Sequence, residues 1–106
     1  MIQGIIIRGT TQVQKFELTQ PEDRLQDIKI IYGQKGKALF SKNLSDCKII
    51  DNKIQVSLMQ EETLLLNPNK LLEVEIISIL KDGQIIGSAT PYTYRVIPSM
   101  NEEIFD

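Results

Sequence analysis

The sequence predicts an all-β domain organised around one hairpin at residues 71–90. Two apolar runs in this stretch flank Asp82-Gly83, and Asp-Gly between such runs is a strong hairpin signal because the turn needs positive φ. Apolar runs also recur roughly every ten residues, with polar turns between them, as in sandwiches and barrels. A chain of 106 residues is long enough for one core and too short for two.

The start of the chain predicts two strands of different character. Ile5, Ile6 and Ile7 are consecutive, so a strand there presents isoleucine on both faces, and one face needs a second cover. A break at residues 9–11 separates this run from residues 12–18, in which apolar and polar side chains alternate. The first strand therefore differs from the second in having two apolar faces.

Two more hairpins are expected before the central one. Residues 27–42 contain two alternating runs around a turn at residues 34–37. Residues 47–58 repeat this arrangement around a turn at residues 51–53, and we expect Cys47 to be a small buried hydrophobic residue there. Each pair of runs predicts two antiparallel strands.

One segment breaks the strand pattern. Residues 60–66 show no two-residue alternation and consist largely of good helix formers, which predicts one or two helical turns. Ser57 and Gln60 fit a capping box, although the preceding strand competes for Ser57. In a sandwich, such a helix commonly crosses from one sheet to the other.

The end of the chain predicts a last strand and a tail. Pro91 marks an edge or a break, because it cannot donate to a ladder. Residues 92–97 then alternate as a strand. We expect a single domain at residues 1–98 and an acidic tail at residues 99–106.

These elements favour one architecture over another. About seven to nine short strands with one short crossover helix indicate an antiparallel immunoglobulin-like β-sandwich. The chain lacks the Cys and Trp hallmarks of antibody domains, since it has no Trp and one Cys. A small closed barrel is the alternative, and it differs from the sandwich in strand pairing.

The composition excludes several function classes. The net charge is −2, and Lys and Arg are scattered among acids, which argues against a nucleic-acid partner. Without His and with Cys47 alone, a His-dependent triad and zinc sites built from His or several Cys are excluded. We expect no metal and no other cofactor.

The chain shows no targeting or membrane signal. No apolar run approaches the about 18 residues of a membrane helix. The apolar start is too short for a signal peptide and has no basic segment before it. We expect synthesis in the cytoplasm and no membrane contact.

Paired acids are the one catalytic device that this composition permits. Glu73 and Glu75 share a strand face, and two adjacent Glu pairs stand at residues 61–62 and 102–103. None shows the asymmetric surroundings that a glycosidase requires of its two carboxylates. The glycines form no phosphate-binding spacing and are explained by turns and bulges. We predict no catalytic residue and no enzyme activity.

The aromatic residues provide a candidate ligand site. Tyr92 and Tyr94 would share a strand face, on which a glycan could stack. Tyr32 is the remaining tyrosine. The simpler alternative is a tyrosine at the edge of the core, with its hydroxyl in water.

Two apolar segments are candidate interfaces. The strand with Ile5, Ile6 and Ile7 has one face without an obvious cover. In the acidic tail, Ile104 and Phe105 form an apolar pair that could dock on a neighbouring subunit.

Several stretches resemble small uncharacterised proteins encoded in phages and prophages of gut Firmicutes. Those proteins usually begin Ile-Arg-Gly-Thr-Thr-Pro and later carry Leu-Thr-Gln-Glu-Glu-Thr-Leu. The similarity runs from Ile7 to about Val96, with Gln12 where the group has Pro and extra residues 2–6 at the start. The stretches that carry it are residues 7–11, 16–18, 31–37, 44–47, 56–64 and 74–76.

The resemblance implies a structural role in a virus particle. The group is similar in size and expected fold to immunoglobulin-like N-terminal modules of phage baseplate and receptor-binding assemblies. It therefore implies a tail or baseplate protein of the virion that binds other virion proteins, as a homo-oligomer. It also implies structural roles for Gly9, Cys47 and residues 60–64. A glycan-binding module for host attachment and a small inhibitor of a host protein are the alternatives.

Overall fold

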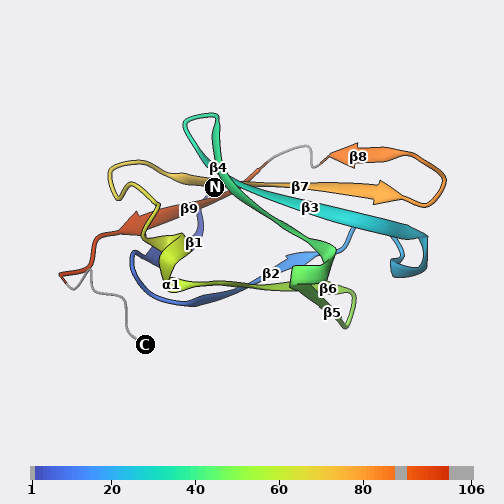
Figure 1. The fold of residues 1–106 in the computed structure, drawn as a ribbon, viewed down its shortest axis with the longest axis horizontal. Coiled ribbons are helices and arrows are strands. Elements are labelled where there is room, and N and C mark those ends of the chain that lie inside the picture. The colour runs from blue at the N-terminus through green and yellow to red at the C-terminus, as the bar shows by residue number, and fades with distance from the viewer. Residues whose placement is uncertain (1, 88–90, 101–106) are drawn as a thin grey trace.

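The computed structural model describes residues 2–87 and 91–100 as two facing β-sheets (Figure 1). The larger sheet has the order β1-β9-β7-β3-β4, with β8 paired to β7, and the smaller sheet has the order β2-β6-β5. The prediction of an all-β domain is confirmed. The strands are β1 (Ile2–Ile7), β2 (Gln12–Glu17), β3 (Leu25–Gln34), β4 (Lys37–Asn43), β5 (Cys47–Ile50), β6 (Lys53–Leu58), β7 (Leu72–Leu80), β8 (Ile85–Gly87) and β9 (Tyr92–Ile97).

The two predicted hairpins before the central one are present, and their turns explain them. The β3–β4 turn has positive φ at both central residues, Lys35 (50°) and Gly36 (75°). The β5–β6 turn does the same at Asp51 (51°) and Asn52 (62°). Two-residue turns of this kind match the twist of the strands that they join.

The central hairpin forms through a different turn. Gly83 has a φ of 93°, whereas Asp82 is not among the residues of positive φ. The Gly83 N–H donates to the Leu80 carbonyl at 3.0 Å, which makes a tight turn followed by a left-handed glycine. Strand β8 is described only as far as Gly87, so residues 88–90 of the predicted hairpin lie outside the described residues.

The core lies between the two sheets and follows from strand alternation. Every second side chain of β7 is buried, and β3 does the same from Ile28 to Gln34. The smaller sheet contributes the buried face of β6. The buried hydrophobic residues are Ile6, Phe16, Leu18, Leu25, Ile28, Ile30, Tyr32, Ile54, Val56, Leu58, Leu66, Leu72, Val74, Ile76, Leu80 and Val96.

One strand pair departs from the expected antiparallel pattern. Strand β1 pairs with β9 in parallel, with Ile6 opposite Val96 and Ile7 opposite Ile97. Parallel neighbours need a connection through other elements, and here the rest of the chain is that connection. The purely antiparallel prediction is therefore wrong at this edge, because pairing between the chain's two ends leaves no local signal.

The predicted crossover helix is present as a single helical turn, within the expected one or two turns. Helix α1 (Gln60–Thr63) links β6 of the smaller sheet to β7 of the larger. The predicted Ser57 capping box is wrong, because Ser57 belongs to β6. Instead, the Met59 N–H donates to Glu62 Oε1 at 2.8 Å at the start of the helix. Two short 3₁₀ turns, η1 (Glu22–Arg24) and η2 (Leu44–Asp46), complete the described elements.

Candidate interaction surface

The structure describes three of the five predicted interface residues. Ile6 is 1 % exposed and belongs to the core, whereas Ile5 and Ile7 are 53 % and 42 % exposed. Ile104 and Phe105 lie outside the described residues. The expectation that the first strand presents isoleucine on both faces is confirmed, and the outer face, with Ile5 and Ile7, is the exposed one.

The backbone of β1 has one paired edge and one open edge. The Arg8 N–H donates to the Ile97 carbonyl at 2.9 Å, so even-numbered residues turn their polar groups toward β9. The polar groups of Ile5 and Ile7 consequently point away from β9. Strand β1 ends the sheet order, and no described strand pairs with this second edge.

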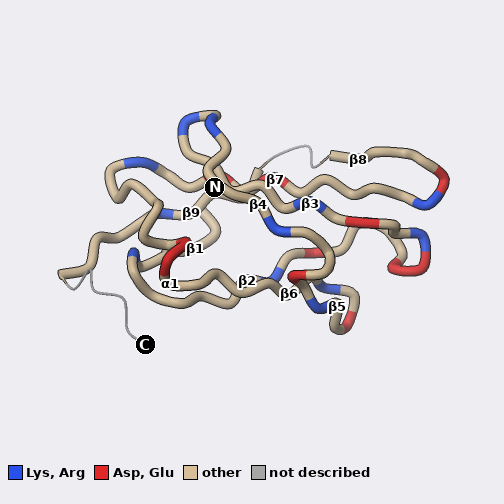
Figure 2. The backbone as a smooth tube through the Cα atoms, viewed as in Figure 1, with Lys and Arg blue, Asp and Glu red and all other residues tan. Residues whose placement is uncertain are grey.

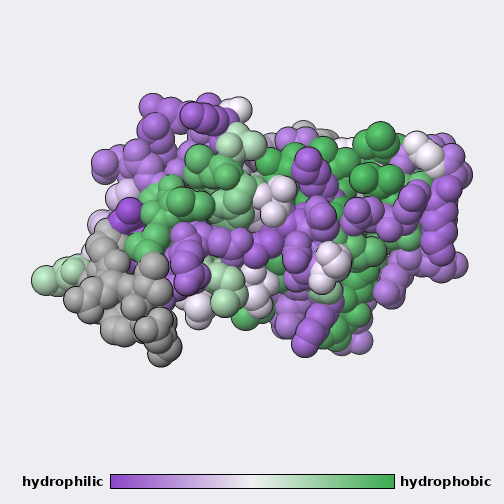
Figure 3. Space-filling view, viewed as in Figure 1, coloured by the Kyte–Doolittle hydropathy of each residue, from purple (hydrophilic) through white to green (hydrophobic). Residues whose placement is uncertain are grey.

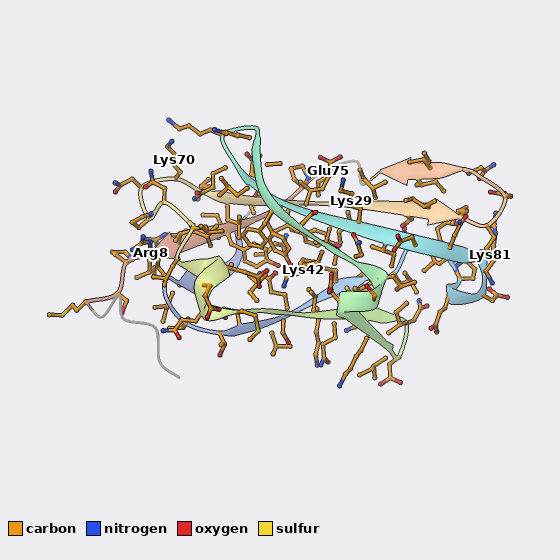
Figure 4. All side chains as sticks on the ribbon, in the orientation of Figure 1. Arg8, Lys29, Lys42, Lys70, Glu75 and Lys81 are labelled. Carbon is orange, nitrogen blue, oxygen red and sulfur yellow. The ribbon has the colours of Figure 1, made fainter. Side chains whose placement is uncertain are left out.

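Side chains from two distant sequence motifs fix the end of β1 against α1. Arg8 Nε and Nη2 donate to the carbonyls of Leu66 and Leu64, both at 2.9 Å, and Figure 4 places Arg8 beside the helix. The Thr63 hydroxyl donates to the Thr10 carbonyl at 2.8 Å and accepts from the Gly9 N–H at 3.0 Å. We call Arg8, Gly9, Thr10 and Thr63 the latch.

Two further contacts support the latch from the larger sheet. Lys42 of β4 forms a salt bridge with Glu62 of α1, with 2.7 Å between the charged atoms. Gln34, at the end of β3, donates to the Asn67 and Lys70 carbonyls and accepts from the Asn67 N–H. The segment after α1 is therefore held by backbone hydrogen bonds to a buried amide.

The latch gives roles to residues whose contacts could not be assigned from the sequence alone. Gly9 has a φ of 79°, which supports the expectation that it serves backbone geometry. The contacts of Arg8 and Thr63 were not predicted, because they join residues more than fifty positions apart. The clustering of Arg8, Gly9 and Thr10 in one motif was the available signal.

The predicted stacking tyrosines lie on the core side of β9. Tyr92 and Tyr94 are half-buried and pack against the hydrophobic core. The Tyr92 ring lies 4.9 Å from the Phe16 ring, measured between centroids. Burial raises the pKa of the Tyr94 hydroxyl above its ordinary value, and Tyr92 adds to this. Glycan stacking on these rings stays a prediction.

A cleft of about 240 Å³ opens between the sheets beside Tyr92. Its lining is mostly apolar, and it includes Leu18, Ile54, Ile76, Ser78 and Ile86. Figure 3 shows hydrophobic side chains at the surface over β8, where Ile85 is 71 % exposed. Gly87, the last described residue of β8, also lines the cleft.

Tyr32 departs from the expectation of a hydroxyl in water. The residue is 0 % exposed, stacks on Phe40 with 4.8 Å between ring centroids, and donates to Gln14 Oε1 at 2.9 Å. Burial raises the pKa of its hydroxyl far above the ordinary value. Tyr32 is therefore a neutral hydrogen-bonded member of the core.

The acids at residues 61–62 lie on α1, and Glu73 and Glu75 lie on β7. Glu75 lies on the face of β7 that turns away from the smaller sheet, as Figure 4 shows, and Glu73 is on the same face. Glu62 is engaged by Lys42. Within residues 2–87 and 91–100, no three His, Cys, Asp or Glu side chains converge as metal ligands.

Charged residues are spread over the whole molecule. Figure 2 shows Lys and Arg on turns and strands with acids among them, whereas β1 is free of both. A surface of mixed sign produces no strong field toward a polyanion. In the described part of the chain, no helix has the length and apolar character needed to cross a membrane.

Cys47 is half-buried rather than fully buried. Its thiol donates to the Asn43 carbonyl, with 3.2 Å between sulfur and oxygen, and the residue packs against the core. Burial raises the pKa of the Cys47 thiol, and Asp46 acts in the same direction. The expectation of a buried residue is therefore only partly met, because β5 is an edge strand.

We expect Cys47 to react slowly with a disulfide reagent at mildly alkaline pH in the folded protein. The thiolate is the reactive species, and a raised pKa lowers its fraction. The folded protein holds the thiol proton more tightly than the unfolded protein, so the raised pKa stabilises the fold. This stabilisation is fully present below the ordinary thiol pKa and is lost as pH rises through the raised value. Labelling rates of folded and urea-unfolded protein test this, with Cys47→Ser as the blank. Equal rates would contradict it.

No family model, curated protein or solved structure matches the chain. The arrangement of its own residues therefore carries the functional argument.

Proposed function

We propose that the chain is a non-enzymatic structural protein of a phage particle, at the tail or baseplate, that acts through contacts with other virion proteins. The proposal depends on one observation about β1. This strand has an open edge, and Ile5 and Ile7 are exposed on its outer face. Open apolar edges are sites of strand addition by other chains. The resemblance of residues 7–11 and 56–64 to phage-encoded proteins supports the same role.

We also propose an immunoglobulin-like sandwich for this fold. The order β9-β7-β3-β4 facing β2-β6-β5 corresponds to the G-F-C-C′ and B-E-D strands of immunoglobulin domains. Helix α1 then lies on the E-to-F connection. This correspondence supports the proposed role, because such modules act mainly as interaction scaffolds.

The particle itself provides the test. Phage particles are purified by density gradient from the strain that encodes the chain, and their proteins are quantified by mass spectrometry. We expect the chain at a fixed ratio to the tail proteins, while a replication protein of the same phage is depleted. A chain that is abundant in the lysate but absent from particles would contradict the proposed function.

A further inference from the structure

We propose that β1 pairs with β1 of a second copy of this chain, in an antiparallel arrangement about a twofold axis. The two larger sheets then continue across the dimer. The inference rests on the proposed function and adds to it the partner and the surface of contact.

The backbone of β1 can accept another strand. The N–H and C=O groups of Ile5 and Ile7 point to the open edge, and the Ile7 carbonyl accepts one hydrogen bond, from the Thr10 hydroxyl at 2.7 Å. A carbonyl oxygen has two lone pairs, so that group can also accept from a neighbouring strand. The latch holds the end of β1 in place, which lowers the entropy lost on pairing.

Charge favours a second copy as the partner. A twofold axis brings each edge against itself, so an edge with one kind of charge repels its copy. Strands β4 and β5, which end the two sheets on their other sides, carry lysines only, and β2 carries both Lys15 and Glu17. Lysine on an edge strand protects it from pairing. Strand β1 has no charged residue.

Among the registers that the alternation of β1 allows, one pairs Ile5 and Ile7 of both copies. With Ile6 opposite Ile6 of the second copy, Ile5 stands opposite Ile7 and exchanges both backbone hydrogen bonds with it. The exposed isoleucines then form two cross-strand pairs on the outer face, a combination that stabilises sheets. The irregularity between Ile2 and Gly4 limits the pairing to the second half of β1.

Light scattering across a concentration series tests the dimer. As concentration increases, we expect the solution mass of the unmodified protein to rise from 12.1 kDa to twice that value. The variants Ile5→Lys and Ile7→Lys should keep the monomer mass at the same concentrations. The matched control is Val13→Lys on the edge strand β2, where the side chain is 61 % exposed. This variant should dimerise like the unmodified chain, and circular dichroism checks that each variant is folded.

Amide hydrogen exchange gives a readout without substitution. The N–H groups of Ile5 and Ile7 should exchange slowly at high concentration and at least tenfold faster on dilution, while the Ile6 N–H changes little. Three outcomes would overturn the proposal. The chain could stay monomeric at every concentration, the dimer could survive both β1 substitutions, or Val13→Lys could lose the dimer to the same extent as the β1 variants. A monomer that is still found in particles would overturn β1 pairing alone, whereas a β1 dimer absent from particles would overturn the proposed function alone.

Discussion

Thr63→Val is expected to lower the free energy of unfolding by about 2–4 kcal/mol, because it removes a buried hydroxyl without changing the volume. Thr63 is 0 % exposed. Its hydroxyl serves the Gly9 N–H, the Thr10 carbonyl and the Gln60 carbonyl. Valine leaves the first two groups without their partner. Both groups are only partly buried, so we expect each to destabilise by about 1–2 kcal/mol, the lower part of the range for a buried unsatisfied group.

Urea unfolding of Thr63→Val and Thr63→Ser separates the contribution of the Thr63 hydrogen bonds to stability from that of its packing. Serine keeps the hydroxyl and removes one methyl group, so we expect it to lose only about 1 kcal/mol. A valine variant as stable as the serine variant would show that the latch hydrogen bonds add nothing to stability. The latch also positions the end of β1, so exchange at the Arg8 N–H should rise in the valine variant.

Gly33→Ala is expected to destabilise the protein by about 1–3 kcal/mol through overpacking against the backbone. A Cβ at this position would lie 2.6 Å from the Lys37 carbonyl oxygen and 3.4 Å from the Ala38 Cα. Neither atom can move without shifting the β3–β4 turn. The clash arises where the register of β3 and β4 shifts between Tyr32 and Gly33.

Gly87→Ala is the matched control for Gly33→Ala. A Cβ on Gly87 meets no atom of the described residues within 4 Å and its φ is not positive, so we expect a change within about 0.5 kcal/mol. Thermal unfolding of the two variants beside the unmodified chain gives the comparison. If Gly33→Ala unfolds at the same temperature as Gly87→Ala, the backbone at Gly33 tolerates a side chain and the prediction is wrong.

The hairpins could be predicted because their signals are local. Gly36, Asn52 and Gly83 occupy turn positions that need positive φ, and apolar residues alternate on either side. The crossover helix could also be predicted, since residues 60–66 interrupt that alternation. Its capping contact was missed, because Met59 and Glu62 make this contact in place of Ser57 and Gln60.

The candidate site depends on contacts between distant segments, and these leave little trace in one sequence. Three isoleucines in a row indicated a strand with two apolar faces, but not that β9 would be its neighbour. Nothing near Tyr32 signals that its hydroxyl meets Gln14 inside the core. Arg8 and Thr63 stood out only as members of motifs, and their partnership appears only in the folded chain.

The parallel pairing of β1 with β9 also determines when the fold can be completed. On the ribosome β1 emerges before the other described strands, and its partner within the described sheets, β9, is the last of these strands to emerge. Until then the Ile5–Ile7 run is unpaired apolar strand, which is the kind of segment that aggregates during folding. Pairing β1 with β9 also closes a loop that contains all the strands between them, which slows folding. Among the described strands, the last to be made therefore pairs with the first and covers one of its edges.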